Sequence, residues 1–271
     1  MVIWVDVGSG SIRGKVREKD EDSIYFQVYS GQNADRYDES GIFVLADGMG
    51  GGEKGEIASK IAVDAFKARG NEILRSDVDN AIKIMKEAIE EGNSNIIQFK
   101  ASNHYSEMGT TVTAVFYRDG WAVIANVGDS RTYVINPGYA IQKTRDHSYV
   151  QELVESGVIT EDEATFHPRR NEISLGLGFQ KGISPDIYVW RIFSGDHILL
   201  CCDGLWEPLH RVLENIIQMR APCQEKVNQM LNLANDMDGT DNISAILFAP
   251  NVDLDIERFS KKPTVSTGTR A

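Results

Sequence analysis

The stretch that decides the fold is residues 43–52, which read FVLADGMGGG. Apolar residues of strand character end abruptly at Asp47, and four of the next five residues are glycines, which adopt turn conformations without steric cost. Behind the turn, residues 53–69 carry apolar side chains near a 3.6-residue period and predict a helix. A carboxylate at the mouth of a buried strand suits a metal or phosphate site, although Asp-Gly after a strand is also an ordinary turn.

The same arrangement recurs along the chain. Asp129 lies in the turn GDSR, Asp203 follows the apolar run 197–202, and Asp241 precedes a strand predicted over 243–248. Carboxylates that gather in one place repel each other, and hard divalent cations, which take oxygen ligands, relieve that repulsion. Because the chain has no Cys/His spacing typical of zinc, the pattern favours magnesium or manganese.

Composition and charge narrow the class of partner. Of the 271 residues, 42% are hydrophobic and 25% charged, which is typical of a globular protein, and the net charge of −12 argues against nucleic acid as the main partner. No stretch approaches the roughly 20 apolar residues of a membrane helix, and the apolar start at 1–5 is too short for a signal peptide. The three cysteines cannot form a disulfide framework, so we expect a cytoplasmic protein in which Cys201 and Cys202 are core residues.

The order of the predicted elements indicates the fold class. Strands and helices come in consecutive groups, which predicts an α+β domain with mainly antiparallel sheets. Gly8-Ser9-Gly10 does not continue as a dinucleotide-binding fingerprint, because Gly14 comes one position late. Residues 144–185 have little periodicity and predict a functional loop or lid. The expected strands are 2–7, 23–29, 43–46, 111–117, 121–127, 132–135, 187–192, 197–202 and 243–248, and the expected helices are 53–69, 76–100, 149–156, 206–219 and 223–237.

Six motifs in chain order resemble those of the metal-dependent protein phosphatases of the 2C type. They are RxxxED at 17–22, DGMGG at 47–51, MGTT at 108–111, GDSR at 128–131, DG at 203–204 and DN at 241–242. The resemblance runs from about Val5 to Phe248 and implies a four-layer α-β-β-α sandwich, in which two mainly antiparallel sheets are flanked by helix pairs. It also implies a catalytic domain over 1–250, with a flap at about 146–178, and a polar, flexible tail over 251–271.

The resemblance implies a binuclear centre of Mg²⁺ or Mn²⁺, with a third ion as an option. In this interpretation two ions are bridged by Asp47, and the backbone carbonyl of Gly48 assists. Asp203 and Asp241 would complete the ligation of one ion. Glu21 and Asp22 would hold metal-bound waters, and Asp129 together with Asp203 would form the third-ion site.

The resemblance further implies a bacterial-type serine/threonine phosphatase that acts in signalling as a cytoplasmic monomer. Arg17 would bind the substrate phosphate, because its planar guanidinium fits two phosphate oxygens, and a water that bridges the two metal ions would attack phosphorus directly. The residues expected to carry catalysis are Arg17, Asp47, Asp203 and Asp241. The expected partners are phosphorylated proteins, including a serine/threonine kinase and its substrates, with no role for nucleic acid or membrane.

Several alternatives stay open at this point. Met49 stands where animal members carry a histidine that is thought to protonate the leaving group, so the general acid is unassigned. A catalytically silent pseudophosphatase that acts as a binding module, and a phosphatase for an anti-sigma-factor antagonist, are alternative functions. A two-metal phosphodiesterase or nuclease fits the acidic composition poorly. For His147 and His167, a structural role and a substrate contact are both possible, whereas the tryptophans Trp4, Trp121, Trp190 and Trp206 are expected to be packing residues.

Overall fold

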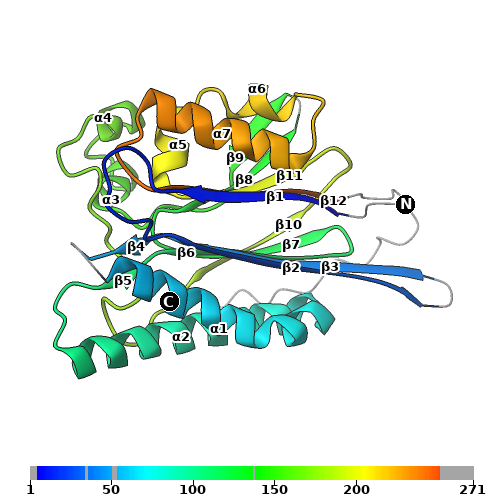
Figure 1. Ribbon diagram of the computed structural model, residues 1–271, viewed down its shortest axis with the longest axis horizontal. Helices are drawn as coiled ribbons and strands as arrows, with labels where there is room; N and C mark the ends of the chain where they lie inside the picture. Colours follow the sequence, from blue (N-terminus) through cyan, green and yellow to red (C-terminus); the bar gives the residue numbers. More distant parts are fainter. Residues whose placement is uncertain (1–4, 34–35, 51–53, 137, 251–271) are drawn as a thin grey trace.

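The computed structural model describes residues 5–33, 36–50, 54–136 and 138–250. Two five-stranded antiparallel sheets pack face to face, with helices α1 and α2 on the outer face of one sheet and α5 to α7 on the outer face of the other (Figure 1). This arrangement confirms the predicted α-β-β-α sandwich. The predicted tail over 251–271, Trp4 and Glu53 lie outside the described residues.

The first sheet carries the strand order β1-β12-β11-β8-β9. All of its neighbouring strands are antiparallel, so the end of β11 lies beside the start of β12, with Cys201 opposite Ala245. The elements of this half of the molecule are β1 (Val5–Ile12), β8 (Arg131–Asn136), β9 (Tyr139–Gln142), β11 (His197–Cys201), β12 (Ile243–Pro250), α5 (Asp203–Leu209), α6 (Leu213–Ile217) and α7 (Cys223–Met237).

The second sheet carries the order β10-β7-β6-β3-β2 and is also antiparallel. A two-stranded ribbon, β4 with β5, joins the start of the glycine-rich turn to the MGTT motif. The flap leaves the sandwich at the end where β4 and β5 lie (Figure 1). The elements are β2 (Ser23–Asn33), β3 (Arg36–Ala46), β4 (Gly48–Met49), α1 (Gly55–Arg75), α2 (Val78–Asn103), β5 (Gly109–Thr110), β6 (Val112–Arg118), β7 (Trp121–Val127), α3 (Tyr149–Glu155), α4 (Glu161–Thr165) and β10 (Asp186–Arg191).

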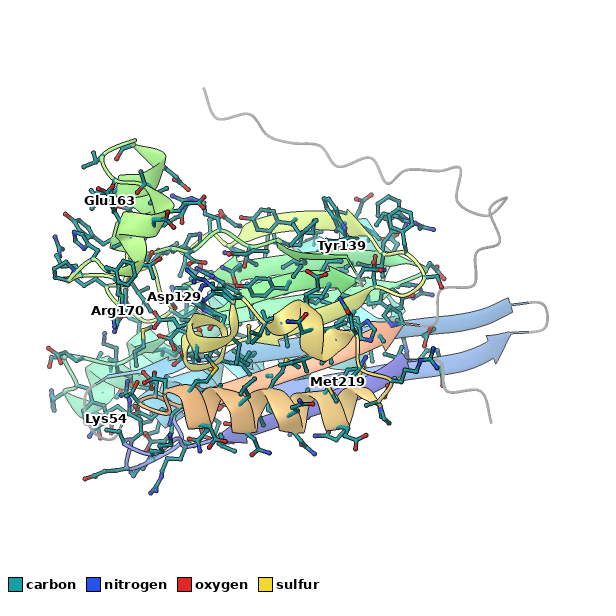
Figure 2. All side chains as sticks on the ribbon, turned by 90° about the horizontal axis from the view of Figure 1, so that it is seen from above. Lys54, Asp129, Tyr139, Glu163, Arg170 and Met219 are labelled. Carbon is teal, nitrogen blue, oxygen red and sulfur yellow. The ribbon has the colours of Figure 1, made fainter. Side chains whose placement is uncertain are left out.

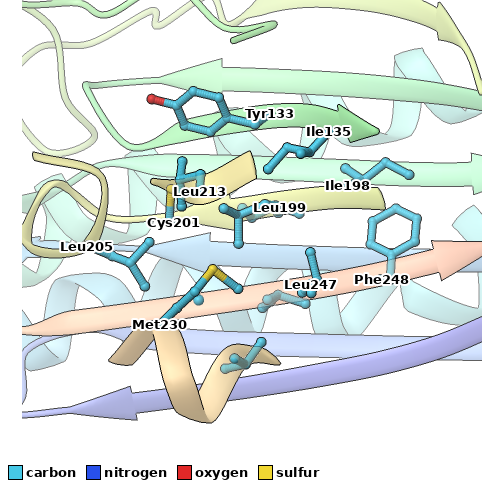
Figure 3. Packing of buried hydrophobic residues seen from close by; sticks show 14 of the residues in the cluster. Tyr133, Ile135, Ile198, Leu199, Cys201, Leu205, Leu213, Met230, Leu247 and Phe248 are labelled. Carbon is cyan, nitrogen blue, oxygen red and sulfur yellow. The ribbon is translucent and has the colours of Figure 1, made fainter. Parts of the chain in front are cut away.

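The two sheets meet through alternating apolar side chains. Phe43 of β3 stacks on Phe248 of β12, with ring centroids 3.8 Å apart and planes 5° from parallel. Successive strand residues point to opposite faces, so Leu247 faces the helices, where Met230 of α7 and Leu205 of α5 belong to the same buried cluster (Figure 3). A second cluster packs α1 and α2 on the outer face of the second sheet. Burial on both faces of each sheet places the open ends of the strands, and not their faces, at the surface.

The structure corrects one predicted element and adds features that the sequence did not indicate. The helix expected over 206–219 is two short helices, α5 and α6; Pro208 lies inside α5 and contributes no backbone N–H, and the chain leaves the helix at His210. Gly8-Ser9-Gly10 lies inside β1, where a Cβ at Gly8 would be 2.4 Å from the backbone of Cys223, so glycine permits the close approach of α7. Strand β9 and helix α4 were not predicted from the sequence. Among the described residues, no helix combines the length and apolar character needed to cross a bilayer.

Candidate metal centre

Asp47 is held at the end of β3 by the two threonines of the MGTT motif. Its carbonyl oxygen accepts hydrogen bonds from Thr111 N (2.9 Å) and Thr110 Oγ1 (2.8 Å), and its own N–H donates to Thr111 Oγ1 (3.0 Å). Thr111 Oγ1 also lies 2.7 Å from Ser130 Oγ, in the GDSR turn. Both threonines are 0% exposed. The backbone of Asp47 is therefore fixed from a separate segment of the chain, and its carboxylate projects from a rigid turn.

Asp203 and Asp241 reach the same end of the molecule from the first sheet. Asp203 follows β11 and accepts a hydrogen bond from Gly204 N at Oδ1 (2.6 Å), whereas Asp241 precedes β12 and accepts one from Asn242 N (2.7 Å). The antiparallel pairing of β11 with β12 brings the two aspartates together. Carboxylate oxygens of Asp47 and Asp203 lie within 4.8 Å of each other. The two sheets thus contribute to one acidic cluster.

The electrostatics of the cluster favour a cation. Burial raises the pKa of Asp47 well above its usual range, and the charges of other acidic residues, Asp22 foremost, raise it further. Burial, followed by the charges of Asp241 and Glu207, raises the pKa of Asp203 to about 6. Like charges in a buried site are unfavourable when alone, and a bound divalent cation reverses this balance.

Two carboxylates around the cluster have a buried oxygen with no hydrogen-bond partner among the described residues, namely Asp22 Oδ1 and Asp129 Oδ1. Burial raises the pKa of Asp22 to about 7, although Ser244 Oγ donates to its other oxygen (2.5 Å). Asp129 is 5% exposed, and burial together with the charge of Asp203 raises its pKa. Buried polar atoms without partners are rare in proteins, and a cation or its hydrating water would satisfy them. An all-oxygen donor set of this kind fits Mg²⁺ or Mn²⁺.

Arg17 lies at the mouth of the cluster. Its Nη2 donates to Asp241 Oδ2 (2.6 Å), and its Nη1 is 3.9 Å from Glu21 Oε2. The side chain of Arg17 is 46% exposed, so part of the guanidinium remains accessible from solvent. Glu21 is buried, and burial raises its pKa even though it accepts a hydrogen bond from Gly55 N (3.2 Å), at the start of α1. This geometry places a cationic fork beside the acidic cluster.

Asn242 holds the loop that carries Arg17. Its side-chain oxygen accepts from Glu21 N (2.9 Å), and its side-chain nitrogen donates to Arg13 O (3.0 Å) and Lys19 O (2.9 Å). Three hydrogen bonds from one buried amide thus fasten the 13–21 loop to the start of β12, next to Asp241. Asn242 belongs to the DN motif at 241–242, whose sequence indicates no role for it; the structure assigns it the positioning of this loop.

The Asp129 turn is tied to the base of the flap through His147. The backbone N–H of Gly128 donates to the ring nitrogen His147 Nδ1 (3.1 Å), and the backbone N–H of His147 donates to Gly128 O (3.0 Å). His147 Nε2 lies 3.2 Å from Asp186 Oδ2, so the ring carries its hydrogen on Nε2. His147 is 4% exposed, which makes it a structural residue. His167 is at the flap, with Nδ1 accepting from Arg169 N (3.1 Å).

A cation–aromatic stack supports the same turn. Arg131 donates to both oxygens of Asp146, at 3.0 Å from Nε and 2.6 Å from Nη2, and lies 3.3 Å from the centre of the Trp206 ring. Trp206 Nε1 donates to Asp129 O (3.1 Å). Trp206 is therefore a packing residue, as expected, in contact with Arg131. Trp190 is instead 41% exposed, and the ammonium group of Lys143 lies over its ring.

The flap supplies charge at the mouth. In Figure 2, Glu163 of α4 lies at the end of the flap that is farther from Asp129, and Arg170 lies at the end that is nearer to it. The positive charge of Arg170 acts on Glu207 of α5, whose pKa is raised by burial and lowered by this arginine. Glu207 was not among the predicted site residues, although its position four residues after Asp203 on one helix is a detectable signal.

Comparison with known proteins agrees with this architecture. The family model described as Protein phosphatase 2C matches residues 20–247. The serine/threonine phosphatase stp of Listeria innocua is 32% identical over 246 residues, which cover 89% of this chain and 94% of the relative. The structure of serine/threonine phosphatase Stp1 from Staphylococcus aureus superposes with a TM-score of 0.82 at 33% identity, covering 91% and 95% of the two chains. The catalytic domain of the phosphatase PstP, solved in complex with two manganese ions, matches with a TM-score of 0.77 at 28% identity, covering 92% and 99%.

The chain belongs to the protein phosphatase 2C family. The recognition made from the six motifs is thereby confirmed. The roles of the individual site residues remain predictions, which the geometry above makes specific.

Proposed function

We propose that this chain is a metal-dependent serine/threonine protein phosphatase that hydrolyses phosphoserine and phosphothreonine in proteins. The observation that carries the proposal is the acidic cluster of Asp47, Asp203 and Asp241, with the Arg17 guanidinium 2.6 Å from Asp241. Family membership and the names of the relatives support the reaction class.

Each residue has a distinct task in the proposed reaction. Asp47 and Asp203 would hold Mg²⁺ or Mn²⁺, and Asp241 would complete the set of ligands from the start of β12. Two bound divalent cations would supply a nucleophile at neutral pH and offset the charge on the phosphoryl group. Arg17 binds two oxygens of the substrate phosphate, for which its half-exposed fork is oriented by Asp241 and Asn242. Asp22, Glu21 and Asp129 supply carboxylate oxygens around this core, and Asp129 with Asp203 could hold a third ion.

Two features of the site limit the mechanism. Met49 has no proton to donate, so leaving-group protonation comes from another group. The three cysteines are free and buried, and burial raises the pKa of each thiol, which is the opposite of what a nucleophilic cysteine requires. Direct hydrolysis without a cysteine intermediate is the reaction that these residues support.

The proposed substrates are phosphoproteins, among them a serine/threonine kinase and its targets. The proposed setting is a bacterial cytoplasm, where the chain acts as a monomer. The free state of all three cysteines supports a reducing compartment. Residues 1–250 are proposed as the catalytic domain, with 146–178 as the flap that contacts the substrate protein.

Phosphate release from a phosphothreonine peptide tests the function. Turnover should require Mn²⁺ or Mg²⁺, stop with excess chelator and fall by at least about a hundredfold in Asp47→Asn, because a ligand should cost more than the 10–100-fold typical of outer-shell residues. Asp64→Asn is the matched control, since Asp64 is an exposed aspartate paired with Lys60 on α1. Folded protein without turnover under metal-replete conditions would reject the enzyme and favour the pseudophosphatase.

A further inference from the structure

Cys202 lies at the acidic cluster as well as in the core. The residue is 0% exposed and belongs to the hydrophobic cluster that packs on both faces of the first sheet. Its sulfur, however, lies within 4.8 Å of carboxylate oxygens of Asp47 and Asp203, and these three atoms all lie within that distance of one another. The site therefore contains one soft donor beside two hard ones.

The hydrogen bonds of Cys202 keep its sulfur on the side of the cluster. Sγ accepts from Ser244 N (3.1 Å), and the thiol donates to Asn242 O (3.4 Å). Burial raises the pKa of this thiol, and the charge of Asp22 is the next largest cause of the rise. Asp22 Oδ1 is the buried oxygen described above that lacks a partner within the described part of the chain. The neighbouring Cys201 is equally buried, but its sulfur lies 3.9 Å from Arg131 O, away from these carboxylates. The two adjacent cysteines thus differ in direction and not in burial.

We propose that Cys202, Asp47 and Asp203 form a binding site for a thiophilic divalent cation, Zn²⁺ or Cd²⁺, which competes with Mg²⁺ or Mn²⁺ for the two carboxylates. Thiolate ligands select soft or borderline metals, whereas carboxylates alone suit magnesium and manganese. Zinc binds sulfur at about 2.3 Å and carboxylate oxygen at about 2.0–2.2 Å, so donors within 4.8 Å of one another need only a small side-chain rotation to share one ion.

The binding step is balanced without any redox change. A metal–sulfur bond forms as the S–H bond of Cys202 breaks, and the proton passes to solvent. With Asp47 and Asp203 engaged, the ions proposed for hydrolysis are displaced, so Zn²⁺ inhibits the enzyme. Only this inhibition rests on the proposed phosphatase function; the binding does not.

The decisive experiment is a titration of the metal-free full chain with Cd²⁺, followed by the ultraviolet cadmium–thiolate charge-transfer absorption. Wild type and the matched control Cys201→Ser should develop the band, and Cys202→Ser, which replaces sulfur by a smaller hydroxyl oxygen, should lose it. The affinity for Zn²⁺, measured by competition with a chromophoric chelator, should fall by about tenfold or more in Cys202→Ser. A band that is absent from wild type, or retained in folded Cys202→Ser, overturns the proposal.

A second measurement needs no variant. Excess Mn²⁺ should reduce the cadmium–thiolate band of the wild-type protein, because both ions require Asp47 and Asp203. A band that does not respond to Mn²⁺ overturns the shared site. Turnover of a phosphopeptide with Mn²⁺ is measured separately, so failure of the proposed function leaves the spectroscopic result standing, and the reverse also holds.

Discussion

Replacing Asp203 by asparagine should stabilise the metal-free protein while it removes activity. The substitution keeps the shape of the side chain, and the new amide oxygen can still accept from Gly204 N. The substitution removes a carboxyl group whose pKa is raised by burial from 3.8 to about 6. This difference corresponds to about 3 kcal/mol of unfavourable free energy for the charged group in the folded state. Because water reaches this half-buried residue and screens its charge, we expect about 1–3 kcal/mol at neutral pH.

Thermal unfolding in the presence of chelator measures this effect. For a chain of this size, 1 kcal/mol shifts Tm by about 2–4 °C, so Asp203→Asn should raise Tm by about 2–12 °C at neutral pH. Addition of Mn²⁺ should stabilise wild type by linkage and should stabilise Asp203→Asn much less. The surface control Asp64→Asn should behave as wild type in both conditions. A lower Tm for Asp203→Asn in chelator, or an equal gain with Mn²⁺, would refute the account of Asp203 as a destabilising charge that a cation neutralises.

Three further predictions address other parts of the site. Burial raises the pKa of Asp22 in the folded state to about 7. The contribution of protonated Asp22 to stability is therefore complete below about pH 4 and is lost as the pH rises through about 7. Tm measured in chelator should fall from about pH 5.5 to about pH 8, and it should fall less steeply for Asp22→Asn. Arg17→Lys should lower kcat/KM for a phosphopeptide by about 10–100-fold, chiefly through KM, because one charged fork is lost, whereas Arg13→Ala on the same loop should change it little. His147→Ala leaves the Gly128 N–H without its acceptor and should lower the free energy of unfolding in urea by about 1–3 kcal/mol. The control His167→Ala, at a partly exposed residue of the flap, should lower it by less than about 0.5 kcal/mol, and equal losses would contradict the role of His147 in holding the Gly128 turn.

The sheets and the acidic cluster could be predicted because their signals are local. Nearly continuous apolar runs mark β3, β6, β7 and β12, and the Asp-Gly turns mark where Asp47 and Asp203 lie. Order along the chain then sufficed to identify the family. In contrast, β9 was not predicted, because its first three residues are exposed and carry no alternation between a buried and a polar face.

The remaining features depend on contacts between distant segments, which a single sequence does not encode as a pattern. Asn242 holds a loop that lies more than two hundred residues earlier, and His147 bonds a turn nineteen residues away. Cys202 illustrates the same limit. Its apolar neighbours predict burial correctly, but the direction of its sulfur follows from the bond to Ser244 N on β12.

The acidic cluster draws its members from both layers of the sandwich, Asp47 from the second sheet and Asp203 and Asp241 from the first. Apolar packing between the layers has little directional preference, so the alignment of the layers at this end depends on polar contacts, such as the one between Thr111 Oγ1 and Ser130 Oγ. Ligand bonds to a cation have set lengths, and an ion held by all three aspartates would lock the alignment of the layers at this end. Metal binding would thus add to the contacts that set the alignment of the two layers, and the metal-free protein would lack these contacts as well as activity.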